Sequence, residues 1–272
     1  MLRFCLLILA ILVPAFSPAQ PIDVERKVWS SEFRQARGQN AAPLPPTRRV
    51  AAVAPMVGVT LWRARKSQPG DQAREILHEA DGTEEISLER IHADTKLFPR
   101  DRLRISIESA QKGFLYVISR EKYADGSAGP PLLIFPSTKI LNGNNLVHPG
   151  RLIELPEADN RIPFFKLKPS RPDQVAEELI LLVAPRPLPG LMSTEKPLRL
   201  EKSQVELWMR QWGAPIQSLE LDGSKAWSRA EQLAGKGGTA LTPADALPQT
   251  LYRVAGQTNN PTMVPLQLKL AQ

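Results

Sequence analysis

The residues best suited to acid–base or metal chemistry are His78, His92 and His148, which lie far apart in the sequence. His92 has a carboxylate two residues away, at Asp94, and residues two apart on a strand share a face, where they could form a dyad or bind a metal. No two histidines have the His-Glu-x-x-His spacing that places two zinc ligands on one helix face. We therefore expect His92 to be an ordinary exposed histidine, and we predict no metal site.

Two glycine-containing stretches share residue types, but not spacing, with known catalytic motifs. Residues 126–129, Gly-Ser-Ala-Gly, lack the Gly-x-Ser-x-Gly spacing of the turn that presents a nucleophilic serine. Residues 235–239 lack the spacing and the preceding strand of a phosphate loop, so they are expected to form a flexible helix exit. The paired glutamates at 84–85 and 177–178 are expected to be surface residues, because adjacency in sequence does not assemble a glycosidase pair across a cleft. We predict no catalytic residue, no cofactor and no enzymatic activity.

The positive charge is spread along the chain. The formal net charge is +7, yet no run of five basic residues occurs. Aromatic residues are few and do not interleave with basic ones in the pattern typical of nucleic-acid binding. We expect a scattered, solvated basic surface and no nucleic-acid partner. The alternative is a basic groove for nucleic acid or for an anionic envelope polymer.

The N-terminus has the pattern of an export signal. Arg3 is followed by the apolar run Phe4–Val13 and by the small residues of Ser17-Pro18-Ala19, which predicts a signal peptide over 1–19 with cleavage after Ala19. The run is shorter than the roughly 20 residues of a membrane span, which disfavours the alternative of an N-terminal anchor. The lone cysteine, Cys5, lies within the signal, so the mature chain is expected to have no disulfide and no thiolate site. We predict a mature protein without a membrane span, in the periplasm or the extracellular space.

The region 20–55 is expected to be a short helix followed by a proline-rich linker. A mixed, charged pattern over Ile22–Gln39 indicates a weakly amphipathic helix, with Val24, Val28, Trp29 and Phe33 on one side. The stretch 41–55, rich in proline and alanine, indicates an extended linker.

Period-two alternation predicts a series of short strands from Met56 onward. The clearest is in Asp101–Ile118, where an alternating strand, a polar turn ending in Gly113 and an apolar strand predict a β-hairpin. The second strand is apolar on both faces, so it is expected to be covered on both sides. The other predicted strands are Met56–Ala64, Arg74–Glu79, Leu132–Phe135, Arg151–Leu155, Ile162–Leu167 and Glu178–Ala184.

After Pro189 the hydrophobic period changes to that of a helix. Ser203 and Glu206 predict a capping box at the start of a helix ending at Trp212, and this helix is expected to lie across the sheet. Its apolar residues are Val205, Trp208, Met209 and Trp212. A second helix is expected over 224–234, with Trp227, Ala230 and Leu233 facing inward. The chain is expected to end in a hairpin formed by 251–254 and 264–270.

These elements favour a mostly β fold: an immunoglobulin-like or related antiparallel β-sandwich with one or two peripheral helices. The predicted domain spans 56–272 and includes a helical insertion at about 201–235. After removal of the signal, the chain is long enough to bury a core without disulfides.

The chain resembles a bacterial family known as domain of unknown function 4384. The residues that carry the resemblance are Val57–Trp62, Asp101–Ile105, Gly113–Ile118, Leu133–Ser137 and Pro248–Val254. The resemblance implies a mostly β module, often found beside caspase-like peptidase or serine/threonine kinase domains or behind an export signal. It implies no activity and no functional residues.

Together these observations favour an exported, non-catalytic module that binds a protein or a cell-envelope component. The alternative is a secreted hydrolase whose site is assembled from distant residues such as His92, Asp94 or His148 with a serine.

Overall fold

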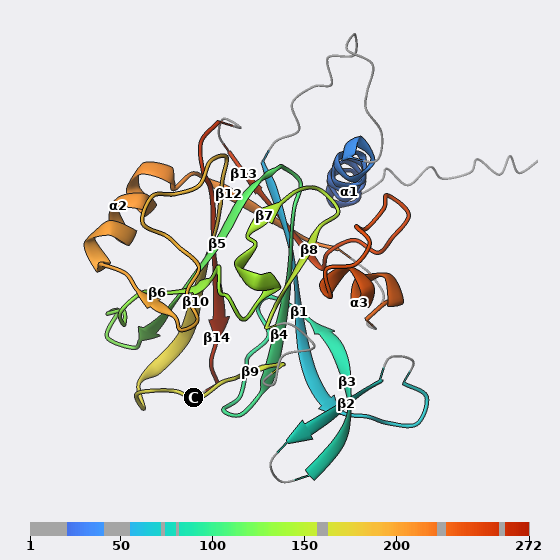
Figure 1. Cartoon of the computed structure of the whole chain (residues 1–272), viewed down its shortest axis with the longest axis horizontal. Helices are drawn as coiled ribbons and strands as arrows, with labels where there is room; N and C mark the ends of the chain where they lie inside the picture. Colours follow the sequence, from blue (N-terminus) through green and yellow to red (C-terminus); the bar gives the residue numbers. More distant parts are fainter. Residues whose placement is uncertain are drawn as a thin grey trace, which may run out of the picture.

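The computed structural model describes residues 21–40, 55–71, 74–79, 82–156, 163–221, 227–255 and 259–271. These residues form a mostly β fold with two antiparallel sheets and three α-helices, as predicted from the sequence (Figure 1). The predicted signal peptide over 1–19 and most of the predicted linker lie outside the described residues.

The first sheet is organised around one long strand, β1 (Met56–Lys66). One edge of β1 pairs first with β13 and then with β3, whereas its other edge pairs with β4 over Val57–Ala64. The other strands of this sheet are β2 (Arg74–Glu79), β3 (Gly82–Ile91), β4 (Arg102–Ser109), β8 (Leu152–Leu155), β9 (Phe165–Lys166), β12 (Ile216–Glu220) and β13 (Thr250–Val254).

The second sheet is centred on β5 (Gly113–Tyr123) and β10 (Gln174–Ala184), which pair along nearly their whole length. Its strand order is β11-β6-β5-β10-β14, and β7 pairs with β5. The remaining strands are β6 (Leu132–Phe135), β7 (Leu146–Val147), β11 (Leu198–Arg199) and β14 (Thr262–Lys269), and a 3-10 turn covers Leu141–Gly143.

The main core lies between the two sheets. Because side chains alternate along a strand, every second residue of β1, β4, β5, β10 and β14 points into this space. Its buried members include Val57, Val59, Leu61, Ile105, Ile107, Leu115, Val117, Leu179, Leu181, Val264 and Leu266.

Helices cover the outer faces of both sheets. On the second sheet, α2 (Lys202–Trp212) packs Val205 and Trp208 against the outward residues of β5 and β10, as predicted. On the first sheet, α1 (Pro21–Asn40) buries Trp29 and Phe33 against the ends of β1 and β13. The helix α3 (Arg229–Gly235) and Trp227, which precedes it, cover β3, β4 and β8. Both sheets therefore have strands that are buried on both faces.

The prediction of a hairpin over Asp101–Ile118 was wrong. Its two strands exist as β4 and β5, but they belong to different sheets, because β4 pairs with β1 while β5 pairs with β10. Residues 110–112 link them, and three residues in extended conformation can span the roughly 10 Å between stacked sheets. The predicted C-terminal hairpin divides in the same way, with β13 in the first sheet and β14 in the second.

The predicted helix starts also need correction. The side chain of Ser203 forms no cap, since α2 begins one residue earlier and Glu201 occupies its N-cap without a side-chain hydrogen bond. A capping box is formed instead by Ser228 and Glu231, at the start of α3. Within the same helix, Leu233 is 52% exposed and does not face inward as predicted.

Two further differences concern the outer layers. In α1, Val24 and Val28 are exposed, because the buried stripe runs through Trp29, Phe33 and Ala36. The predicted helical insertion at about 201–235 also contains a strand, β12, which extends the first sheet by pairing with β13.

Candidate functional site

The two histidines whose side chains the structure describes, His92 and His148, have separate partners. His92 is exposed, and its Nδ1 lies 3.3 Å from Oε2 of Glu220, not beside another histidine. Asp94 is exposed, and Nδ1 of His148 lies 3.1 Å from the backbone oxygen of Pro149. The side chain of His78 lies outside the described residues. In the described part of the chain, no three histidine or carboxylate side chains group as metal ligands.

The two glutamate pairs lie in different environments. Glu84 and Glu85 bind Arg102 and Arg74 at the rim of the β2–β3 hairpin, as expected of surface residues. The prediction was wrong for Glu177 and Glu178, because they lie in the middle of β10 and β10 is covered on both faces. Glu178 is 3% exposed and points toward α2, whereas Glu177 points into the space between the sheets.

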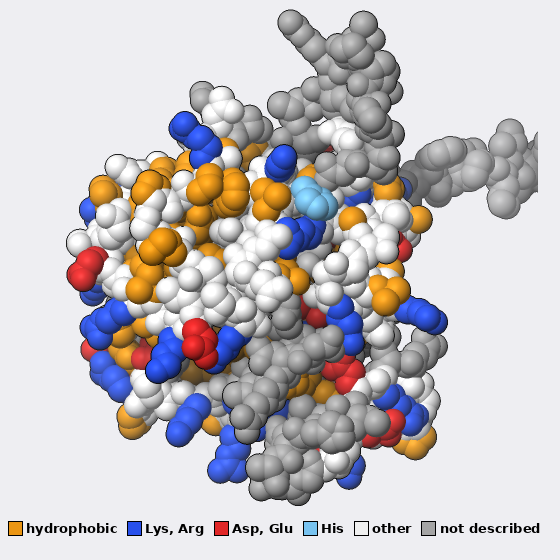
Figure 2. All heavy atoms as spheres, in the orientation of Figure 1, with side chains coloured by type: hydrophobic (Ala, Val, Ile, Leu, Met, Phe, Trp, Pro, Cys, Tyr) orange, Lys and Arg blue, Asp and Glu red, His pale blue; other side chains and the backbone are white. Residues whose placement is uncertain are grey.

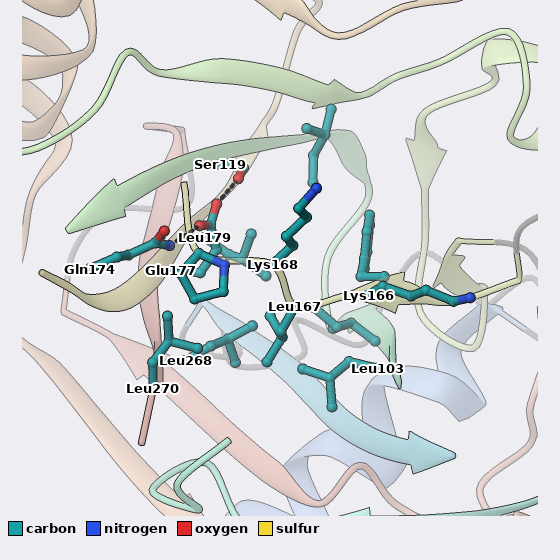
Figure 3. Close-up of a pocket in the computed structure, with 14 residues that line it drawn as sticks. Leu103, Ser119, Lys166, Leu167, Lys168, Gln174, Glu177, Leu179, Leu268 and Leu270 are labelled. Carbon is teal, nitrogen blue, oxygen red and sulfur yellow. Dashed lines mark hydrogen bonds between the residues drawn. The ribbon is translucent and has the colours of Figure 1, made fainter. Parts of the chain in front are cut away.

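The side chain of Glu177 reaches a pocket of about 250 Å³ between the two sheets (Figure 3). Nine of its 14 lining residues are apolar, and they come from β4, β6, β9, β10, β14 and the residues that follow β9 and β14. The lining residues are Leu103, Ile105, Ser119, Ile134, Phe165–Pro169, Gln174, Glu177, Leu179, Leu268 and Leu270.

One end of the pocket is polar. The Ser119 hydroxyl donates to Oε1 of Glu177, and the side-chain amide of Gln174 donates to Oε2 at 3.2 Å (Figure 3). Burial raises the pKa of Glu177, and the negative charge of Glu121 raises it further, against the lowering effect of these two hydrogen bonds. A carboxyl group with a raised pKa is more readily protonated, so it can offer a hydrogen-bond donor as well as acceptors.

Two lysines flank the pocket: Lys166 at the end of β9, and Lys168 in the segment that follows it. Residues 165 and 167 turn apolar side chains inward, and Lys166 and Lys168 alternate with them and are exposed. Figure 3 shows the two lysine side chains leaving this segment in different directions. Among the described residues, Lys168 forms no ion pair, so its ammonium group is available to an anionic group at the pocket.

The size and lining of the pocket suit a slender apolar group. Its volume of about 250 Å³ exceeds the roughly 150 Å³ at which a leucine- and isoleucine-lined cavity takes up benzene. It is close to the lower limit of about 300 Å³ for small-molecule sites. The arrangement can therefore bury one narrow apolar chain, hydrogen-bond to a polar atom at Glu177, and attract a negative charge at Lys168.

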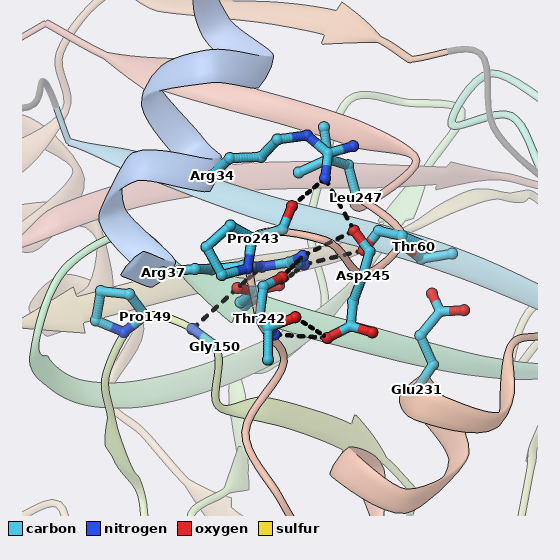
Figure 4. Close-up of polar contacts among 12 residues, drawn as sticks. Arg34, Arg37, Thr60, Pro149, Gly150, Glu231, Thr242, Pro243, Asp245 and Leu247 are labelled. Carbon is cyan, nitrogen blue, oxygen red and sulfur yellow. Dashed lines mark hydrogen bonds and ion pairs between the residues drawn. The ribbon is translucent and has the colours of Figure 1, made fainter. Parts of the chain in front are cut away.

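A second polar cluster, missed by the sequence analysis, lies under α1 and α3. Nε and Nη2 of Arg37 donate to the two carboxylate oxygens of Glu108 at 2.8 and 2.7 Å, and both side chains are almost completely buried. The Gly150 amide also donates to Glu108, and Arg37 donates further to carbonyl groups of residues 242–246 (Figure 4). This satisfied ion pair fastens α1 to the first sheet, so we assign it a structural role.

A different buried carboxyl group, on β8, is not fully paired. Glu154 on β8 is fully buried, and burial raises its pKa to about 8, although nearby Arg104 lowers it. Oε1 accepts a long hydrogen bond of 3.4 Å from Ser106, and Oε2 has no partner among the described residues. Glu154 lines neither the pocket between the sheets nor the other pocket described below, so we consider its effect on stability.

Comparisons with protein-family models, curated proteins and solved structures found no match for this chain. The resemblance to domain of unknown function 4384 therefore stays a prediction. No helix among the described residues is long and apolar enough to cross a membrane. Figure 2 shows Lys and Arg side chains dispersed over the visible face, not gathered in one groove.

Proposed function

We propose that this chain is an exported, non-catalytic binding module, and that the pocket between its sheets holds the acyl chain of an anionic amphiphile of the cell envelope. The observation that carries the proposal is the combination in one pocket of an apolar wall, a partly buried carboxyl group at Glu177 and an exposed ammonium group at Lys168, which has no ion-pair partner among the described residues. An apolar lining with a few placed polar groups is typical of small-ligand sites.

The expected affinity is moderate. Burying a methylene group contributes about 0.8 kcal/mol, so a chain with roughly eight buried methylenes gains about 6 kcal/mol. The cost of association is of similar size, and the charge of the head group adds only modestly at an exposed lysine. We expect dissociation constants between about 1 µM and 1 mM.

The test is a calorimetric titration of the mature protein with dodecanoate below its micelle concentration, at several temperatures. The proposal predicts saturable binding of one chain with a negative heat-capacity change, the mark of apolar burial. Dodecylammonium has the same chain with a positive head group, so it should bind more weakly, and Lys168→Gln should reduce this difference. Equal binding of both amphiphiles with no effect of Lys168→Gln would refute the assignment of the head-group site.

A matched pair of variants tests where the acyl chain binds. Leu167→Trp places a larger side chain in the pocket and should abolish dodecanoate binding. Leu198→Trp is the control, because Leu198 is also half-buried but packs on the outer face of the second sheet, beside α2. If Leu167→Trp still bound dodecanoate, the acyl chain would bind outside this pocket.

The alternative of a hydrolase is tested by a separate activity assay. The pocket contains a serine, Ser119, hydrogen-bonded to a carboxyl group, but no described histidine lines it. Turnover of p-nitrophenyl laurate that disappears in Ser119→Ala would replace the binding proposal with an esterase.

A further inference from the structure

A second pocket, of about 340 Å³, lies on the opposite face of the second sheet, between β5 and α2. Adjacent residues of β5 separate the two sites, since Ser119 points between the sheets and Arg120 points toward α2. The lining residues are Arg120, Lys122, Gly126, Ser127, Ala128, Lys202, Glu206, Met209 and Arg210. This second pocket, which we call the α2 pocket, is thus independent of the acyl-chain proposal.

Helical periodicity explains why four of these residues share one wall. Positions 202, 206, 209 and 210 repeat at intervals of about one and two turns, so they form one face of α2. The neighbouring face is fixed by Val205 and Trp208, which pack on the sheet. The opposite wall is the turn at Gly126, whose φ of 80° needs a glycine, and a bridge between Lys122 and Ala128 ties this turn to β5.

The cations in the α2 pocket are incompletely neutralised. Arg120 is held by Glu178 through Nε and contacts Met209 through Nη2, which leaves Nη1 without a partner in the described structure. Nζ of Lys122 is 4.0 Å from the same carboxylate.

On the helix, Nζ of Lys202 is likewise 4.0 Å from Glu206, beyond hydrogen-bond distance. Arg210 is exposed and forms no ion pair within the described ranges. Four cations thus face two carboxylates, Glu178 and Glu206, and the α2 pocket has a net charge of two positive units.

We propose that the α2 pocket binds a phosphomonoester group. Such a group carries a charge of about −1.5 to −2 at pH 7 and three acceptor oxygens, which matches the net charge and the unused donors of Arg120, Lys122, Lys202 and Arg210. A singly charged carboxylate would leave the pocket with excess positive charge. The group can belong to a small soluble ester or to a lipid head group, and the experiment separates these two sources.

The experiment uses the mature protein at low ionic strength. Inorganic phosphate and glycerol phosphate are titrated by calorimetry, and phosphatidylcholine vesicles with and without phosphatidic acid are tested by co-sedimentation. The pocket variant is Lys202→Gln with Arg210→Gln. The control is Lys139→Gln with Arg186→Gln, which removes the same charge from exposed residues outside the α2 pocket. Thermal midpoints confirm that both variants are folded.

We expect at least one probe to bind the wild type and the control with equal affinity, and to bind the pocket variant at least about tenfold more weakly, since two of four cations are lost. Binding of glycerol phosphate supports a soluble ester, and binding only to vesicles with phosphatidic acid supports a lipid head group. The proposal is overturned if the wild type binds none of the probes, or if the control loses as much affinity as the pocket variant.

Discussion

Replacement of Glu154 by glutamine should make the protein more stable at alkaline pH. Glu154 is enclosed so tightly that a Cβ atom on Gly235 would lie only 2.3 Å from its carboxyl carbon. Burial raises its pKa from about 4.5 to about 8, so the folded protein keeps this group protonated at neutral pH. Glutamine has nearly the same shape and is neutral at every pH, so the variant isolates the effect of charging this one position.

The direction of the pH dependence of stability follows from proton binding. Between pH 4.5 and pH 8 the folded state holds a proton on Glu154 that the unfolded state has lost, so the free energy of unfolding falls as the pH rises. The slope is up to about 1.4 kcal/mol per pH unit. Between pH 5 and pH 8 the wild type should lose about 3 kcal/mol relative to the variant, a large part of a typical stability of about 5–15 kcal/mol.

The measurement is urea unfolding of both proteins at pH 5, 6, 7 and 8, with the free energies compared at each pH. At pH 5 both side chains are essentially neutral in the folded state, so the comparison there is the internal control for any change in packing. The difference in free energy should then grow in favour of Glu154→Gln as the pH rises. A difference that stays constant from pH 5 to pH 8 would refute the raised pKa.

Two other predictions concern the architecture, and a third concerns export. Arg37→Ala leaves Glu108 buried without its charged partner, so it should cost about 3–5 kcal/mol and expose α1 to proteolysis. Arg34→Ala is the control, because it removes only partly exposed hydrogen bonds to carbonyl groups, and equal effects of the two variants would contradict the assignment. Truncation at Gln249 removes β13 and β14 and exposes leucine, valine and methionine side chains worth roughly 1.5–3 kcal/mol each, so the fragment should be insoluble or unfolded; a cooperatively folded fragment with an unchanged thermal midpoint would contradict this. The intact mass of the protein recovered from the cell envelope should match a chain starting at or near Gln20, and the mass of the uncut chain would disprove export with cleavage.

The strands could be predicted from the sequence more readily than their partners. Alternation over Leu103, Ile105 and Ile107 identifies β4 correctly, because one face of a strand must be apolar wherever a core covers it. The same alternation fits a hairpin or a crossing between sheets, since both bury the same side chains. The choice depends on long-range pairing of β1 with β4 and of β5 with β10, which is not encoded in local periodicity.

The candidate sites were less predictable. Glu177 and Glu178 occur at the start of the apolar run of β10, and two charged residues in a strand that is covered on both faces are a signal of buried polar function. Recognising that signal requires knowing that the strand is central in its sheet. The pocket itself combines residues from six segments between Leu103 and Leu270, so only the folded chain defines its shape.

The most direct test of the acyl-chain proposal is a methyl NMR spectrum of the mature protein, with labelled isoleucine and leucine, during titration with dodecanoate. The proposal predicts saturable shifts concentrated on the methyl groups of Leu103, Ile105, Leu179, Leu268 and Leu270, which line the pocket between the sheets. Shifts confined to exposed methyl groups outside that pocket, or no saturable shift, would contradict it.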